Sequence, residues 1–203
     1  MLLTSTTVNG AVSNDSNNNI TMSVGNTVIA NVNSSGIFFE SGKKAIYTGA
    51  VLQVVQATLA GTQAVSGASA WTDVTSLSAA ITPTSSTSKI LVSFVVNCDG
   101  ENNLYFRIMR GSTAIGVGNA DGVKQQVSAG NGYVPSNSNG TTMMVNQFLD
   151  SPATTSSTTY KIQAYCDSSA GSGTYYINYA SGDGNNVYSS RCMSTLTLME
   201  IAV

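Results

Sequence analysis

Apolar and polar residues alternate along much of this chain in short segments. Ile90, Val92, Phe94 and Val96, for example, occupy every second position of one segment. Successive side chains of a β-strand point to opposite faces, so a period of two predicts a strand with one buried face. No segment keeps a helical period over ten residues. Strands are predicted at 50–59, 72–82, 88–97, 103–110, 113–117, 141–149, 158–166, 174–180 and 191–202.

The alternation also predicts the core. Two further segments place every second residue on a buried face, and these residues are Leu104, Phe106, Ile108, Tyr160, Ile162, Ala164 and Cys166. The final segment differs, because both of its faces are apolar. Such a strand is expected either at a central position in a sheet or at a subunit interface. We favour burial near an oligomer axis.

The N-terminal part predicts a separate small sheet. Segments 20–24, 27–32 and 37–39 are strand-like, and Gly25-Asn26 between the first two is typical of a tight hairpin turn. Three such strands are too few for independent stability. They are expected to pack on the rest of the chain or on other copies. The residues predicted at an oligomer interface are Ile20, Val24, Ile37, Phe38, Met199, Ile201 and Val203.

Turn-rich segments separate the later strands at regular intervals, as in Pro83 to Ser88. Many short strands at this spacing predict an all-β fold, a jelly-roll-like antiparallel sandwich. We expect an N-terminal attachment and oligomerisation region at 1–48. The sandwich would form a knob at 49–203.

Charge changes this picture in one respect. Only 9% of the 203 residues are charged and the net charge is −2, whereas soluble proteins carry about 25% charged residues. A neutral polar surface suits a protein in a permanent assembly. The few basic residues form no cluster, so no nucleic acid partner is expected.

Targeting signals and cysteines add little. The start, Met1 to Thr7, has no basic segment followed by a long apolar one, so no signal peptide is expected and the chain would be assembled in the cytoplasm where it is made. The apolar stretches are far shorter than a membrane span, so no membrane insertion is expected. Cys98, Cys166 and Cys192 are widely spaced, which favours free thiols, with one disulfide as the alternative.

The residue inventory argues against an enzyme. Histidine is absent, which removes histidine-activated nucleophiles and histidine metal sites. Asp99 and Glu101 flank Gly100, a pattern more typical of a turn than of a catalytic pair. A calcium site from these two acids and Asp121 is conceivable, but no cofactor or metal is predicted.

Aromatic residues are the remaining candidates for binding. Trp71, Tyr175, Tyr179 and Tyr188 are the candidate surface-binding residues, because aromatic rings make strong contacts in recognition. The alternative is ordinary cross-strand packing. Loops 118–140 and 181–190, rich in Gly, Ser and Asn, are also expected to face solvent and to take part in binding.

Five ordered blocks carry a resemblance to a known group of proteins: Val51 to Gln56, Ile81 to Val92, Phe148 to Pro152, Thr158 to Gln163 and Leu196 to Ile201. They resemble a β domain of bacteriophage tail-fibre and virion-structural proteins, notably of marine and cyanobacterial phages. The resemblance implies a homotrimer in the virion, on the tail or the head. It also implies contacts with other virion proteins and attachment to a host surface glycan or protein.

Two alternatives stay open, and a third is disfavoured. A capsid decoration protein would reinforce the shell without binding a receptor. A free carbohydrate-binding module would be monomeric and would expose a Tyr/Trp platform. A tailspike depolymerase would need a parallel β-helix with long repeats and clustered acids, which this sequence lacks.

Overall fold

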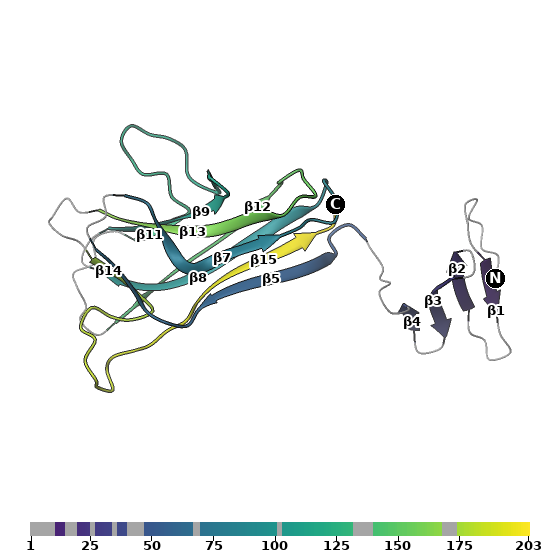
Figure 1. Ribbon diagram of the computed structural model, residues 1–203, viewed down its shortest axis with the longest axis horizontal. Coiled ribbons are helices and arrows are strands. Elements are labelled where there is room, and N and C mark those ends of the chain that lie inside the picture. The colour runs from purple at the N-terminus through teal and green to yellow at the C-terminus, as the bar shows by residue number, and fades with distance from the viewer. Residues whose placement is uncertain are drawn as a thin grey trace. The chain divides into compact units, whose positions relative to one another are not determined.

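The computed structural model describes residues 11–14, 20–24, 27–33, 36–39, 47–66, 70–100, 103–131, 140–167 and 174–203. The chain divides into two compact units, Met1–Tyr47 and Thr48–Val203. We call them the N-terminal unit and the C-terminal unit. The elements assigned in the described ranges are all strands (Figure 1). No helix among these residues has the length and apolar character needed to cross a bilayer.

The N-terminal unit is a four-stranded antiparallel sheet in the order β1-β2-β3-β4. Its strands are β1 (Ala11–Asn14), β2 (Ile20–Val24), β3 (Thr27–Asn33) and β4 (Gly36–Phe39). The last three are the predicted meander. The first was not predicted, because Ala-Val-Ser-Asn carries almost no apolar signal. The predicted turn at Gly25-Asn26 lies outside the described residues.

The C-terminal unit is built from two antiparallel sheets. One has the order β10-β9-β13-β7, with β11 also paired to β9, and we call it the small sheet. The other has the order β5-β15-β8-β14-β6, with β12 also paired to β8, and we call it the large sheet. The bounds are β5 (Val51–Leu59), β6 (Gln63–Ser66), β7 (Thr72–Ile81), β8 (Lys89–Gly100), β9 (Leu104–Arg110), β10 (Thr113–Ile115), β11 (Ala129–Asn131), β12 (Thr142–Asp150), β13 (Thr158–Cys166), β14 (Thr174–Ile177) and β15 (Ser194–Ile201).

The core confirms the alternation. Ile90, Val92, Phe94 and Val96 on β8 are at most 1% exposed, and so are the predicted core residues of β9 and β13. Together with Leu196 and Leu198 they form one apolar cluster. Burial of such side chains contributes about 1.5–3 kcal/mol each. The predicted all-β sandwich is therefore confirmed.

β15 is an interior strand of the large sheet. It pairs with β5 on one side and β8 on the other. One of the two predicted settings for a strand with two apolar faces, a position inside a sheet, is therefore observed, and the favoured burial near an oligomer axis stays a prediction. Leu196 and Leu198 face the core, while Met199 and Ile201 on the other face are partly buried.

Some strand ends differ from the prediction. The segment predicted at 174–180 stops at Ile177, because Asn178 has a φ of 69° and leaves the extended conformation. The segment predicted at 191–202 begins as a strand only at Ser194. The short strands β6 and β11 were not predicted. Two long loops project from the sandwich, one between β10 and β11 and one between β14 and β15 (Figure 1).

Candidate functional site

Three aromatic residues lie in one row across the outward face of the small sheet. Tyr165 of β13 is the direct partner of Tyr105 of β9. On the other side, Ala164 pairs with Thr72, so Trp71 lies next to Tyr165. The Trp71 and Tyr165 ring centroids are 5.5 Å apart, and those of Tyr105 and Tyr165 are 6.2 Å apart. All three residues are partly buried. We call Tyr105, Tyr165 and Trp71 the aromatic row.

A polar row runs beside the aromatic row, two residues away from it along each of the same chain segments. It consists of Arg107 on β9, Gln163 on β13 and Asp73 on β7. Arg107 donates to the Gln163 Oε1 from Nε at 3.0 Å and from Nη2 at 2.7 Å. Gln163 Nε2 donates to Asp73 Oδ1 at 2.8 Å. The three side chains thus form one hydrogen-bonded chain.

A cation–π contact joins the aromatic row to the polar row. The Arg107 guanidinium carbon lies 4.1 Å from the centre of the Trp71 ring, a cation–π contact. Lys161 pairs with Asp73 at 2.8 Å. Burial alone raises the pKa of Asp73, but hydrogen bonds from Lys161 and Gln163 outweigh it and the pKa is lowered. Asp73 is therefore a carboxylate at neutral pH.

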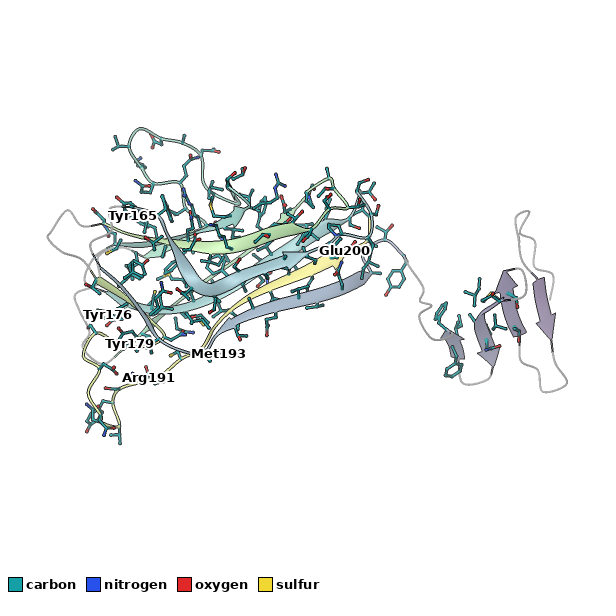
Figure 2. The ribbon with its side chains drawn as sticks, viewed as in Figure 1. Tyr165, Tyr176, Tyr179, Arg191, Met193 and Glu200 are labelled. Atoms are coloured by element: carbon teal, nitrogen blue, oxygen red, sulfur yellow. The ribbon has the colours of Figure 1, made fainter. Side chains whose placement is uncertain are left out.

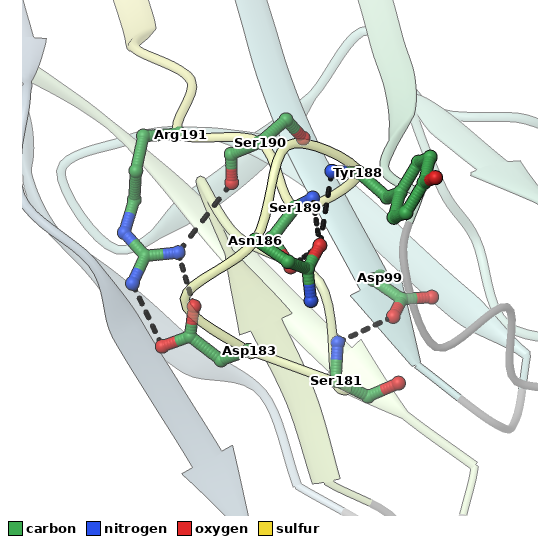
Figure 3. Close-up of polar contacts among 8 residues, drawn as sticks. All are labelled: Asp99, Ser181, Asp183, Asn186, Tyr188, Ser189, Ser190 and Arg191. Carbon is green, nitrogen blue, oxygen red and sulfur yellow. Dashed lines mark hydrogen bonds and ion pairs between the residues drawn. The ribbon is translucent and has the colours of Figure 1, made fainter.

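The loop between β14 and β15 begins and ends at a bridge between Tyr179 and Arg191. Tyr179 packs edge-on against Tyr176, with ring centroids 5.1 Å apart. Arg191 lies 5.5 Å from the Tyr179 ring and pairs with Asp183 (Figure 3). The contact with Asp183 raises the pKa of Arg191 further. In Figure 2, Tyr176, Tyr179 and Arg191 lie toward one end of the C-terminal unit, and Glu200 lies toward the other.

Hydrogen bonds within this loop hold its shape. Asn186 Oδ1 accepts from the backbone N–H of Tyr188 at 2.9 Å and of Ser189 at 3.1 Å. Asp99 Oδ2 accepts from the Ser181 N–H at 2.7 Å and ties the loop to β8 (Figure 3). At the tip, Tyr188 is 75% exposed. The loop therefore presents an aromatic ring on an ordered turn.

The four predicted binding residues have different fates. Trp71 belongs to the aromatic row, and Tyr188 is at the exposed loop tip. Tyr179 is partly buried beneath Arg191. Tyr175 is fully buried, so its prediction as a surface-binding residue is wrong. It lies on the inward face of β14, where its ring fills the core.

Sequence reasoning missed five of the six members of the two rows: Tyr105, Arg107, Gln163, Tyr165 and Asp73. Arg107 and Gln163 are 56 positions apart in the chain, and the pairing register that joins them is not visible in either segment. The available signal was the outward residues of each strand, Tyr105 and Arg107 on β9 and Lys161, Gln163 and Tyr165 on β13. Both sets carry large polar or aromatic side chains on the solvent face.

The outward face of the large sheet is apolar in places. Met199 on β15 pairs with Val54 on β5 and Leu91 on β8, and Leu91 pairs with Leu149 on β12. Val54 is 56% exposed and Leu149 is 46% exposed. We call these four residues the apolar row. The neighbouring row consists of Gln56, Thr197, Ser93 and Gln147, and it carries no charge.

The predicted interface residues can be placed in part. Met199 lies in the apolar row, Ile201 is partly buried at the end of the same strand, and Val203 is 61% exposed. In the N-terminal unit, Ile37 is 59% and Phe38 is 49% exposed. The side chains of Ile20 and Val24 lie outside the described part of the structure.

The acidic residues and cysteines singled out in the sequence can be placed in part. Among the described residues no group of three or more acids or cysteines is placed to hold a metal ion. Asp99 is buried and bonded to backbone N–H groups, and Glu101 lies outside the described residues. The three cysteines are free thiols. Burial, with a smaller effect of the Asp99 charge, raises the pKa of Cys98 to about 12, so this thiol stays protonated.

No protein-family model matches the sequence, and no curated protein does. Similar solved structures include infectious bursal disease virus Gx strain, at 20% identity and a TM-score of 0.37, covering 74% of this chain and 37% of that one. The structure of the Gt strain of this virus matches at 16% identity and a TM-score of 0.37, and the match covers 91% of this chain and 48% of that one. The VP2 subviral particle of the same virus matches at 14% identity and a TM-score of 0.34, and the match also covers 91% of this chain and 48% of that one. This chain spans less than half of each, and TM-scores this low do not establish a common fold.

Proposed function

We propose that this protein is a structural subunit of a phage virion fibre, assembled as a homotrimer, whose exposed loops take part in attachment to the host surface. The observation that carries the proposal is the apolar row on an open sheet face. The resemblance of the ordered sequence blocks to phage fibre proteins supports the virion location. A tail or a head position fits equally well.

The apolar row argues for assembly on energetic grounds. A fully buried Val, Leu or Met side chain gains about 1.5–3 kcal/mol. Val54 and Leu149, which are about half exposed, would each gain about half of that when a partner covers them. Contiguous exposed apolar surface of this kind is typical of interaction sites.

The character of this face points to another copy of the chain as the partner. Lys89, the partner of Ile201, places one positive charge at the border of this face, but neither the apolar row nor the adjacent Gln/Thr/Ser row contains a charged residue. A charged partner surface would lose its water there without gaining an ion pair. A neutral face in a second copy avoids this cost, and a ring of three copies closes such contacts by symmetry.

The β14–β15 loop supports the attachment part of the proposal. Val187 and Tyr188 at its tip are 92% and 75% exposed. The hydrogen bonds that Asn186 Oδ1 accepts within the loop order the turn before any partner binds. A pre-ordered loop loses less entropy on binding, which favours recognition.

Light scattering of the purified full-length chain tests the trimer. We expect a mass three times the chain mass of 20.9 kDa. The double variant Val54→Lys and Leu149→Lys should lower the mass, because two charges would be buried at the interface. Ser78→Lys is the matched control, since Ser78 is exposed on the other sheet, and it should leave the trimer intact.

Two results would overturn parts of the proposal. A wild-type mass of one chain refutes the trimer. Binding of the labelled protein to virions but never to host cells refutes the attachment role and favours a decoration protein instead. Loss of host-cell binding after Tyr188→Ser, with the trimer retained, would support attachment through the loop.

A further inference from the structure

We propose that the aromatic row and the polar row together form a binding site for a neutral saccharide. The inference deepens the attachment role proposed above by naming its ligand class, and its biological meaning rests on that role. It concerns the outward face of the small sheet, a surface different from the apolar row and from the β14–β15 loop.

The first argument is the pairing of two kinds of group. A sugar ring has apolar C–H patches and a rim of hydroxyls, so a receptor needs apolar rings beside hydrogen-bonding groups. The aromatic row supplies three rings within 6.2 Å of their neighbours. The polar row lies two residues away from the aromatic row along the same chain segments. Pockets and platforms that orient a ligand combine these two elements.

The second argument is donor capacity. The guanidinium of Arg107 has five N–H donors, and only part of them is used on Gln163. Carboxylate and amide oxygens accept several hydrogen bonds each. Asp73 and Gln163 therefore keep acceptor positions for ligand hydroxyls after forming their mutual bond.

The third argument is preorganisation. The row Arg107–Gln163–Asp73 is held by three hydrogen bonds of 2.7–3.0 Å, and Lys161 adds an ion pair to Asp73. These side chains already occupy fixed positions on three paired strands. Binding therefore loses little side-chain entropy, which is a main cost of association.

Charge favours a neutral ligand over an acidic one. Arg107 and Lys161 provide two positive charges, and Asp73 and Asp167 provide two negative charges around the rings. Asp167 belongs to this surface, because its N–H donates to the carbonyl of Asn103 beside Tyr105. The four charges sum to zero. A uronic acid polymer would gain no net attraction here.

Trp71 makes the site directly measurable, because it is the single tryptophan of the chain. Titration of the full-length protein with maltohexaose or cellohexaose, followed by tryptophan fluorescence, should give a saturable change. We expect a dissociation constant on the order of 1 mM or tighter. Hexagalacturonate, an acidic hexasaccharide, should bind at least about tenfold more weakly.

Variants locate the binding. Gln163→Ala and Tyr165→Ala should each weaken binding by about tenfold, the effect of one good hydrogen bond or ring contact. Tyr47→Ala is the control, since Tyr47 is an exposed tyrosine remote in sequence from both rows. It should bind as the wild type does. Circular dichroism of every variant verifies the fold.

The result that overturns the inference is a flat titration with both neutral probes, or binding unaffected by both row variants. Stronger binding of hexagalacturonate overturns the choice of a neutral ligand. Light scattering on the same samples separates this outcome from failure of the fibre proposal. A trimer that ignores saccharides refutes only the present inference, and a monomer that binds them refutes only the fibre.

Discussion

Asn178 is a fully buried polar residue. Its hydrogen bonds and its backbone conformation both fix the base of the loop between β14 and β15. Its amide nitrogen donates to the carbonyls of Leu59 and Gly61, at 2.7 Å each. Its oxygen accepts from the Ser194 hydroxyl at 2.6 Å. Its φ of 69° turns the chain out of β14, and asparagine tolerates this conformation better than most residues. One side chain thus joins the base of the loop to β5 and β15.

Replacing this residue should therefore be costly. We expect Asn178→Ala to lower the free energy of unfolding by about 2–4 kcal/mol, because buried carbonyls lose their donor and alanine is strained at positive φ. Urea denaturation measures the loss. Asn119→Ala, at an exposed position in the other loop, should change stability by less than about 0.5 kcal/mol. Equal effects of both substitutions would contradict this reading.

Glu200 is the second buried polar residue with a defined role. It is 0% exposed and accepts from Gln53 Nε2 at 2.6 Å and from the Thr84 N–H and hydroxyl at 2.7 Å. Burial alone raises the pKa of Glu200, but these hydrogen bonds lower it to about 2. A carboxylate with a depressed folded pKa stabilises the protein above its unfolded pKa, and this stability disappears as the pH falls through the folded value.

The pH dependence of stability should report this carboxylate. At pH 7 we expect Glu200→Gln to lower the free energy of unfolding by about 3 kcal/mol. The gap between wild type and variant should shrink from about pH 4.5 downward and vanish near pH 2. Urea denaturation at pH 7, 5 and 3 measures it. A gap that stays constant with pH would show that the charge is not the stabilising feature.

At the scale of elements, the turn after β10 approaches β12 closely. Gly116 has a φ of 59°, and a Cβ at this position would lie 2.7 Å from Cγ of Phe148. Both the conformation and the space therefore require glycine. The close approach fixes how the β10–β11 loop leaves the sandwich.

Substitutions at Gly116 and Gly118 should show whether the positive φ and the lack of space at Gly116 matter, or whether any change in this loop lowers stability. Gly116→Ala should lower the midpoint of thermal unfolding, with a loss of about 1–3 kcal/mol from strain and overpacking. Gly118→Ala is the matched control two residues away, where a Cβ would meet nothing within 4 Å. It should leave the midpoint close to that of wild type. A larger loss at Gly118 would refute the steric argument.

Elements also show how far sequence reasoning reached. Strands with large apolar residues at every second position, such as β8 and β13, were predicted within a few residues. The short β11, Ala-Gly-Asn, was missed because small residues carry no alternation. The aromatic row was missed for another reason. Tyr105 and Tyr165 are ordinary within their own segments, and only the pairing of β9 with β13 brings them together.

At the scale of the whole molecule, the division of surfaces is the main result. The core lies between the two sheets of the C-terminal unit, and each outward sheet face has its own character. The large sheet presents an uncharged apolar row, and the small sheet presents rings beside a polar network. One sandwich therefore presents two different surfaces, one for the proposed assembly and one for the proposed ligand binding.

The place of β15 has a consequence for biosynthesis. β15 lies between β5 and β8, yet it leaves the ribosome after both of them, and the paired residues Gln56 and Thr197 are 141 positions apart. Until β15 emerges, β5 and β8 have open edges with no strand between them. Such edges pair readily with foreign strands, and distant pairing is slow. The nascent chain is thus exposed to misassembly until β15 has been synthesised.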